Sequence, residues 1–150
     1  MLRERFTAEM KEAMKASEKG KLGAIRLIQA ALKDKDIEAR GLGKEPLADA
    51  DVLALLQKMV KQREESLGIY EKAGREDLAV VEREEIVILS EFLPKGLSEA
   101  EVDAAIKAAI EKTGASGGKD MGKVIAALKA DYPGRIDFGK ASGRVKAALG

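Results

Sequence analysis

The chain of 150 residues contains no histidine, no cysteine and no tryptophan. Without histidine it lacks the usual general base near neutral pH, and without cysteine it lacks thiol nucleophiles, disulfides and the common zinc-ligand sets. Catalysis by carboxylates or lysine remains open. The absence of cysteine is also typical of proteins from a reducing compartment. We expect no metal centre and no cofactor.

Long apolar runs are missing as well. No stretch approaches the roughly 20 apolar residues of a membrane span. The first residues, Met1–Arg5, lack the apolar segment of a signal peptide. We therefore expect a soluble, cytoplasmic protein that has no membrane partner.

Helical periodicity covers most of the chain, and no segment alternates with a period of two for long enough to require a strand. The predicted fold class is therefore all-α. Gly20, Gly41, Gly74 and Pro94 stand where four helices are expected to end. Helices are expected at 2–19, 21–40, 49–73, 75–92, 99–113, 121–130 and 138–149.

A domain boundary is predicted around Leu93–Leu97, because Pro94 and Gly96 interrupt the helical pattern there. Directly afterwards, Ser98 and Glu101 have the spacing of a capping box. The prediction is an N-terminal domain at 1–93 and a C-terminal three-helix domain at 97–150, joined by a linker at 94–96. The first is expected to be a bundle of about four helices that includes a long antiparallel hairpin.

One charged pair is expected inside that hairpin. Arg63 falls within the apolar stripe of its helix, and Glu85 falls within the stripe of the next, with Glu82 close by. Arg63 lies eleven residues before Gly74 and Glu85 eleven after it, so a turn at Gly74 places them opposite each other. We predict a partly buried ion pair of Arg63 with Glu85 or Glu82. A structural role is favoured over a catalytic one, because a single buried charge is costly and no nucleophile or metal ligand is near.

Charge is unevenly distributed along the chain. From Lys112 to Gly150 there are eight basic and three acidic residues, a net charge of +5, whereas the whole chain carries +1. The other residues therefore carry −4. A basic tail on an acidic body is typical of a protein that binds a polyanion, although a solvated lysine-rich surface has the same composition.

Glycine, hydroxyl and lysine residues crowd together at 114–123, directly before an expected helix. Backbone N–H groups at a helix start, with two lysines beside them, are suited to bind phosphate. Gly117 to Lys123 also matches the first seven positions of a P-loop, but Val124 stands where magnesium binding needs Ser or Thr, and a helix rather than a strand precedes the run. A nucleotide site is therefore not expected. The structural alternative is a flexible connector in which Asp120 caps the helix.

More cations follow in the turn at 134–137 and in the last helix. If the starts of the last two helices adjoin, these cations share a face with the two lysines. The tail offers only Tyr132 and Phe138 for base stacking, so recognition of the RNA backbone is expected rather than base reading. The residues expected to contact phosphate are Lys119, Lys123, Arg135, Lys140 and Arg144, assisted by the amides of Gly117 and Gly118.

Several short motifs occur in a specific order along nearly the whole chain. They are Arg26–Ile28, Ala31–Lys33, Gln57–Arg63, Tyr70–Leu78, Glu91–Pro94, Gly114–Ser116 and Lys119–Val124. Together they resemble the YqeY-like family, which is related to the helical and tail regions of the B subunit of the tRNA-dependent Asp/Glu amidotransferase. The paired glycines Gly117 and Gly118 depart from that pattern and loosen the loop.

The resemblance implies an all-α, two-part fold and a tail that holds tRNA or another structured RNA. It also carries a family label, carbon–nitrogen ligase activity with glutamine as amido-nitrogen donor. These 150 residues contain no amidase nucleophile arrangement, no ATP site and no ammonia-generating half. We therefore expect a non-catalytic RNA-binding or accessory protein. The alternatives are a protein–protein adaptor that docks through the hairpin, with an aminoacyl-tRNA synthetase or amidotransferase component as partner, and a subunit that assists amide transfer in trans.

Overall fold

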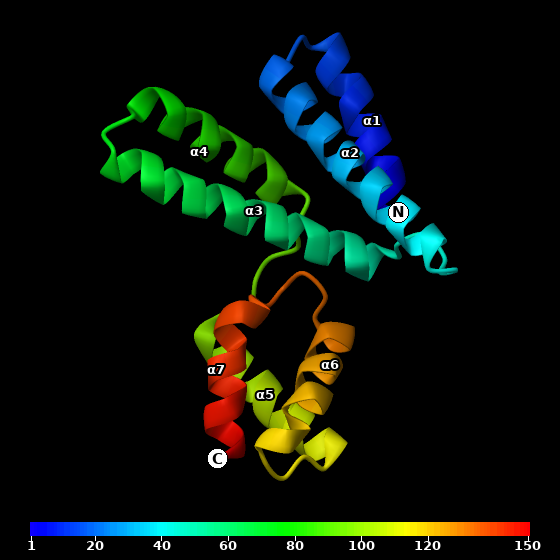
Figure 1. Cartoon of the computed structure of the whole chain (residues 1–150), viewed down its shortest axis with the longest axis vertical. Coiled ribbons are helices and arrows are strands. Elements are labelled where there is room, and N and C mark those ends of the chain that lie inside the picture. The colour runs from blue at the N-terminus through cyan, green and yellow to red at the C-terminus, as the bar shows by residue number, and fades with distance from the viewer. The chain divides into compact units, whose positions relative to one another are not determined.

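The computed structural model describes all 150 residues and contains seven α-helices, one 3-10 turn and no strand (Figure 1). The all-α prediction is confirmed. No helix combines the length and the apolar composition needed to cross a membrane. The helices are α1 (Leu2–Lys15), α2 (Lys19–Gly41), α3 (Asp49–Lys72), α4 (Glu76–Glu91), α5 (Glu99–Thr113), α6 (Met121–Asp131) and α7 (Phe138–Leu149), with the 3-10 turn at Gly118–Asp120.

The chain forms two compact units, Met1–Leu93 and Pro94–Gly150. The first unit consists of two antiparallel pairs, α1 with α2 and α3 with α4, and the second contains α5, α6 and α7 (Figure 1). The expected N-terminal bundle with its long hairpin and the C-terminal three-helix group are therefore both present.

The first helix boundary differs from the sequence prediction. α1 ends at Lys15 rather than near Lys19, because Ser17 adopts a positive φ of 57° and turns the chain. Gly20 does not end a helix; it lies within the first turn of α2, which continues to Gly41. The cost of glycine in a helix, about 1 kcal/mol, is smaller than the gain from packing the apolar face of α2.

Other helix ends follow local rules. Gly74 and Gly114 take the left-handed conformation after α3 and α5, with φ of 69° and 68°. Ser98 and Glu101 form the expected capping box at the start of α5. Asp137 caps α7 by accepting hydrogen bonds from two backbone N–H groups. Asp49 is the first residue of α3 rather than its cap, since Ala48 holds the cap position.

The core of the first unit joins all four helices. Phe6 of α1 packs edge-on against Phe92 after α4, with ring centroids 5.0 Å apart. The buried apolar side chains of this core are Phe6, Ile25, Ile28, Leu32, Val52, Leu56, Met59, Leu89 and Phe92. Helical spacing puts Leu78 and Val81 of α4 near the same stripe as Ile88 and Leu89, but the structure exposes both.

The second unit has a core of its own. Its buried side chains come from α5, α6, α7 and the turn before α7, and they are Ala105, Ile106, Ala109, Val124, Leu128, Ile136, Ala141 and Val145. The turn is fastened to the start of α5, because the backbone N–H of Leu97 donates to the carbonyl oxygen of Arg135 at 2.9 Å. This contact places Arg135 beside the start of α5.

Candidate nucleic-acid interface

The loop between α5 and α6 is organised around the Asp120 carboxylate. Asp120 stands at the cap position of α6, yet its side chain makes no hydrogen bond to that helix. It turns back and accepts a hydrogen bond from the backbone N–H of Ser116 at 3.1 Å. Asp120 thus holds the predicted cap position of α6, but its side chain stabilises the loop rather than the helix. The 3-10 turn at Gly118–Asp120 places the carboxylate over the loop instead.

This carboxylate remains charged at the start of α6. The hydrogen bond from the Ser116 backbone lowers the pKa of Asp120, and the positive charge of Lys123 lowers it further. A negative side chain near a helix N-terminus is itself stabilised by the helix dipole. The chain thus supplies its own anion in the loop that contains Gly117 and Gly118, and a phosphate bound by their amides would be repelled by it. Lys119 and Lys123 are stronger candidates for phosphate binding.

Lys119 and Lys123 present their ammonium groups to solvent. Lys119 is exposed and makes no ion pair within the chain. The Lys123 Nζ atom lies 3.6 Å from Asp120 Oδ1, in a pair whose lysine side chain is 69% exposed. Exposed pairs of this kind contribute about 0–1 kcal/mol. Both lysines are therefore available to a polyanion.

Arg135, Lys140 and Arg144 border a shallow pocket of about 240 Å³ at the start of α7. Arg135 Nε donates to the carbonyl oxygen of Lys95 at 2.9 Å, which ties the turn to the start of the unit. Lys140 is exposed and forms no ion pair. The apolar floor of the pocket consists of Leu97, Val102, Ile136 and Ala141.

Arg144 is already held by acidic side chains of α5. Its Nη1 atom lies 2.7 Å from Asp103 Oδ1, and its Nη2 atom lies 3.4 Å from Glu99 Oε2. The hydrogen bond to Asp103 raises the pKa of Arg144 above its usual value. An RNA phosphate must compete with these carboxylates, so Arg144 is a weaker candidate than Lys119 or Lys140.

The expected shared face is not formed, because the starts of α6 and α7 do not adjoin. The short connection at 132–137 reverses the chain, so α7 runs antiparallel to α6 (Figure 1). The loop lysines lie at the start of α6, whereas Arg135 and Lys140 lie beyond its end. Helix α6 itself is eleven residues long, about 16 Å. The cations form an extended surface rather than one compact site.

The structure places Arg63 and Glu85 together within the hairpin. Arg63 Nε lies 2.7 Å from Glu85 Oε2, and the two side chains are 17% and 25% exposed. Arg63 Nη1 also approaches the Met59 carbonyl oxygen at 3.4 Å. Of the two partners that the sequence left open, Glu85 makes the contact, while the Oε2 atom of Glu82 is buried without a hydrogen bond. The pair lies between α3 and α4.

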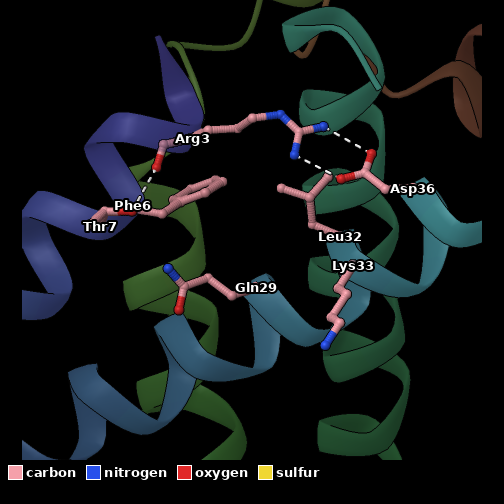
Figure 2. A pocket seen from close by; sticks show the side chains of 7 residues that line it. All are labelled: Arg3, Phe6, Thr7, Gln29, Leu32, Lys33 and Asp36. Atoms are coloured by element: carbon pink, nitrogen blue, oxygen red, sulfur yellow. Dashed lines mark hydrogen bonds and ion pairs between the residues drawn. The ribbon is translucent and has the colours of Figure 1, made fainter. Parts of the chain in front are cut away.

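A second charged cluster, which the sequence analysis missed, lies in the first unit. Arg3 Nη1 is 2.7 Å from Asp36 Oδ2, and Arg3 Nη2 is 2.9 Å from Asp36 Oδ1, as the dashed lines in Figure 2 show. Arg3 also donates to the Leu47 carbonyl oxygen, and the Leu47 N–H donates to Asp36, both at 2.9 Å. These bonds fasten α1 to α2 and to the loop before α3. No local pattern reveals the cluster, because 33 residues separate its charged members.

A pocket of about 260 Å³ lies beside this cluster, lined also by Phe6, Thr7, Gln29, Leu32 and Lys33 (Figure 2). The Arg3 guanidinium and the Asp36 carboxylate that line it form an ion pair with each other. Arg3 lowers the pKa of Asp36 below its usual range, and Asp36 raises that of Arg3. No group of three or more acidic side chains in the chain is arranged to hold a metal ion. We interpret the cluster as a structural clamp.

These features define a class of small all-α proteins with two helical units. The chain belongs to the YqeY-like family, since the family model described as "Yqey-like protein" matches residues 3–149. The resemblance inferred from the short motifs is thereby confirmed.

Relatives of the chain are fungal proteins named "Altered inheritance of mitochondria protein 41, mitochondrial". The protein from Pyrenophora tritici-repentis is 31% identical over 131 residues, which cover 83% of this chain and 70% of the relative. That from Lachancea thermotolerans is 33% identical over 100 residues, covering 65% and 52%. The relative from Eremothecium gossypii is 32% identical over 85 residues, covering 57% and 45%.

The matches to the two yeast proteins thus cover about half of each relative's length or less. The names assign the relatives to mitochondria and state no ligand or reaction. The expected cytoplasmic location of this chain stays a prediction.

Proposed function

We propose that the C-terminal unit binds structured RNA through its phosphate backbone, with tRNA as the class that the family relationship suggests. The observation that supports this most is that three lysines are largely free of acidic partners within the chain. Lys119 and Lys140 have no ion-pair partner, and Lys123 has only a long, exposed one. They belong to the segment whose net charge is +5.

The separation of the lysines favours recognition of an extended polyanion. Lys119 precedes the start of α6, and Lys140 lies in α7 beyond the turn that follows the end of α6, a helix about 16 Å long. One phosphate group cannot bridge that length, whereas a nucleic-acid backbone presents phosphates along its course. Because each lysine acts as a point charge, the contacts carry no base specificity.

The aromatic residues of the tail offer little support for base stacking. Phe138 is half-buried, packs against the core of the second unit, and has Lys129 Nζ 5.5 Å from its ring centroid. Tyr132 also packs against that core. Without stacking, most of the affinity comes from electrostatic attraction and counterion release. The proposal is therefore sequence-independent binding that weakens steeply with salt.

We further propose that this binding is an accessory role without autonomous catalysis. The proposal rests on the residues that surround two of the pockets, which are mainly cations, apolar side chains and carboxylates held in ion pairs or in a helix cap. In this view, any glutamine-dependent amide transfer belongs to other proteins. Glutamine-dependent amidation of a charged tRNA by the purified chain alone contradicts the proposal.

Substitution of the two loop lysines tests RNA binding. We expect Lys119→Ala with Lys123→Ala to reduce affinity for total tRNA about tenfold at 50 mM salt, by fluorescence anisotropy, because two phosphate contacts are lost. The matched control is Lys58→Ala with Lys61→Ala, which removes two exposed lysines from α3. An equal loss in both double variants contradicts the assignment to the loop.

A further inference from the structure

Helix α4 has apolar side chains on two faces, of which the core of the first unit uses only one. Ala79 and Leu89 are fully buried on the inner face. On the outer side, Val80, Val81 and Val87 are 42%, 47% and 60% exposed. A surface helix of a globular protein usually carries a single apolar stripe. The second face of α4 therefore has no counterpart within the unit.

The outer face has a regular order along the helix. Val80 and Val87 are seven residues apart, so they lie two turns apart on the same line. Asp77, Glu84 and Glu91 repeat at the same interval and alternate with the valines. A seven-residue repeat of apolar side chains is the spacing that two packed helices share, and β-branched residues suit such a seam.

Two acidic members of this line, Glu84 and Glu91, are available for an outside partner. The ion pairs of α4 are made by Glu76, Asp77, Arg83 and Glu85. None of them involves Glu84 or Glu91. The surrounding segment from Glu64 to Glu91 contains nine acidic and three basic residues, so its net charge is −6. This field repels a nucleic acid and attracts a cationic protein surface.

We propose that the outer face of α4 is a docking surface for a basic amphipathic helix of another protein. The partner helix carries apolar side chains that pack against Val80 and Val87, and lysine or arginine residues that pair with Glu84 and Glu91. Charge complementarity selects this partner over RNA. The surface lies in the acidic first unit and is independent of the proposed RNA binding by the second.

A synthetic peptide tests the surface directly. The probe is a 21-residue helix of three heptads, with leucine at the apolar positions and lysine at the flanking positions, labelled for fluorescence anisotropy with the full chain. One control peptide has the same composition in scrambled order, and another replaces each lysine by glutamate. We expect the first peptide to bind at least tenfold more tightly than either control.

Variants of the chain connect that binding to α4. Val80→Ser with Val87→Ser is expected to weaken peptide binding at least tenfold, and Glu84→Lys with Glu91→Lys to transfer the preference to the glutamate peptide. Ile37→Ser with Leu42→Ser is the matched control, because these apolar residues are also exposed in the first unit. Exposed substitutions of this kind rarely unfold a protein, and circular dichroism verifies the helix content.

Several results overturn the proposal. Equal binding of the scrambled peptide shows attraction by charge alone, and unchanged binding by the Val80→Ser/Val87→Ser variant places the site elsewhere. If the chain dimerises in sedimentation experiments and this double variant abolishes the dimer, the face binds a second copy of the chain instead. Loss of peptide binding in the Lys119→Ala/Lys123→Ala variant also contradicts the docking proposal. Failure of tRNA binding alone contradicts only the proposed function of the second unit.

Discussion

At the scale of single residues, the charged side chains of this protein divide into those used internally and those left to solvent. Arg3, Arg63 and Arg144 each hold a carboxylate at 2.7 Å. Lys119 and Lys140 hold none. Arginine, with its planar fork of donors, is suited to fixed pairs, while lysine keeps a strongly hydrated charge. The exposed lysines are therefore the better candidates for a mobile or extended ligand.

Removal of one partner of the Arg63–Glu85 pair is expected to destabilise the fold, because the charge of the other partner is left without a counter-ion. Arg63→Met leaves Glu85 near Glu82, two carboxylates without a cation between the helices. We expect this variant to lose about 1–3 kcal/mol of unfolding free energy, less than a fully buried pair because the side chains keep some solvent contact. Urea denaturation measures the loss. Arg63→Met with Glu85→Met is expected to recover part of it, and an unchanged midpoint in the single variant contradicts the assignment.

The Arg3–Asp36 clamp makes stability depend on acid. Arg3 and the Leu47 N–H lower the folded-state pKa of Asp36 below its ordinary 3.8, so the carboxylate contributes stability above that value. The contribution is lost as pH falls through the lowered pKa. We expect Asp36→Asn to reduce the decrease in unfolding free energy between pH 5 and pH 3, measured by urea denaturation. Asp34→Asn, at an exposed position of the same helix, is the control, and equal pH profiles for both variants contradict the clamp.

At the scale of elements, local rules explain the helix ends that the sequence predicts. The Ser98 capping box, the Asp137 cap and the glycines after α3 and α5 each need only neighbouring residues. Ser17 was missed because a serine with a positive φ has no distinct sequence pattern. Periodicity alone does not identify the buried face of α4, because apolar residues occur on more than one side of that helix.

Two glycines are expected to respond to alanine in opposite directions. Gly23 lies inside α2 with no atom within 4 Å of an added Cβ, so Gly23→Ala should stabilise the chain by about 0.5–1 kcal/mol. Gly74 has a φ of 69°, which strains any other residue, so Gly74→Ala should destabilise it by about 1 kcal/mol or more. Thermal unfolding followed by circular dichroism gives both signs. Stabilisation by Gly74→Ala would contradict the hairpin turn as described.

At the scale of the whole molecule, each unit has a separate buried core, and the division into independent domains stays a prediction. The Arg63–Glu85 contact follows from the symmetry of the hairpin about Gly74, so it was within reach of the sequence. The spatial arrangement of the cations was not, because whether the starts of α6 and α7 adjoin depends on how three helices pack. The same dependence on packing explains why the Arg3–Asp36 clamp was missed.

The C-terminal unit is expected to fold without the first. Residues 94–150 are near the lower practical size for a single domain, but they contain a buried core of eight side chains and a tethered turn. We expect the isolated fragment to be helical and to unfold cooperatively on heating, as judged by circular dichroism. A fragment with a non-cooperative, sloping melt contradicts the prediction that 97–150 is an independent domain.

The salt dependence of tRNA binding by the full chain tests the central claim most directly. Three lysine contacts predict that log K falls with log salt concentration with a slope of about −2 to −3, and that the Lys119→Ala/Lys123→Ala variant flattens it by about 1–2. The measurement is a fluorescence anisotropy titration with total tRNA from 50 to 300 mM salt. Absence of binding at low salt, or a slope that the double variant leaves unchanged, contradicts phosphate recognition by the loop lysines.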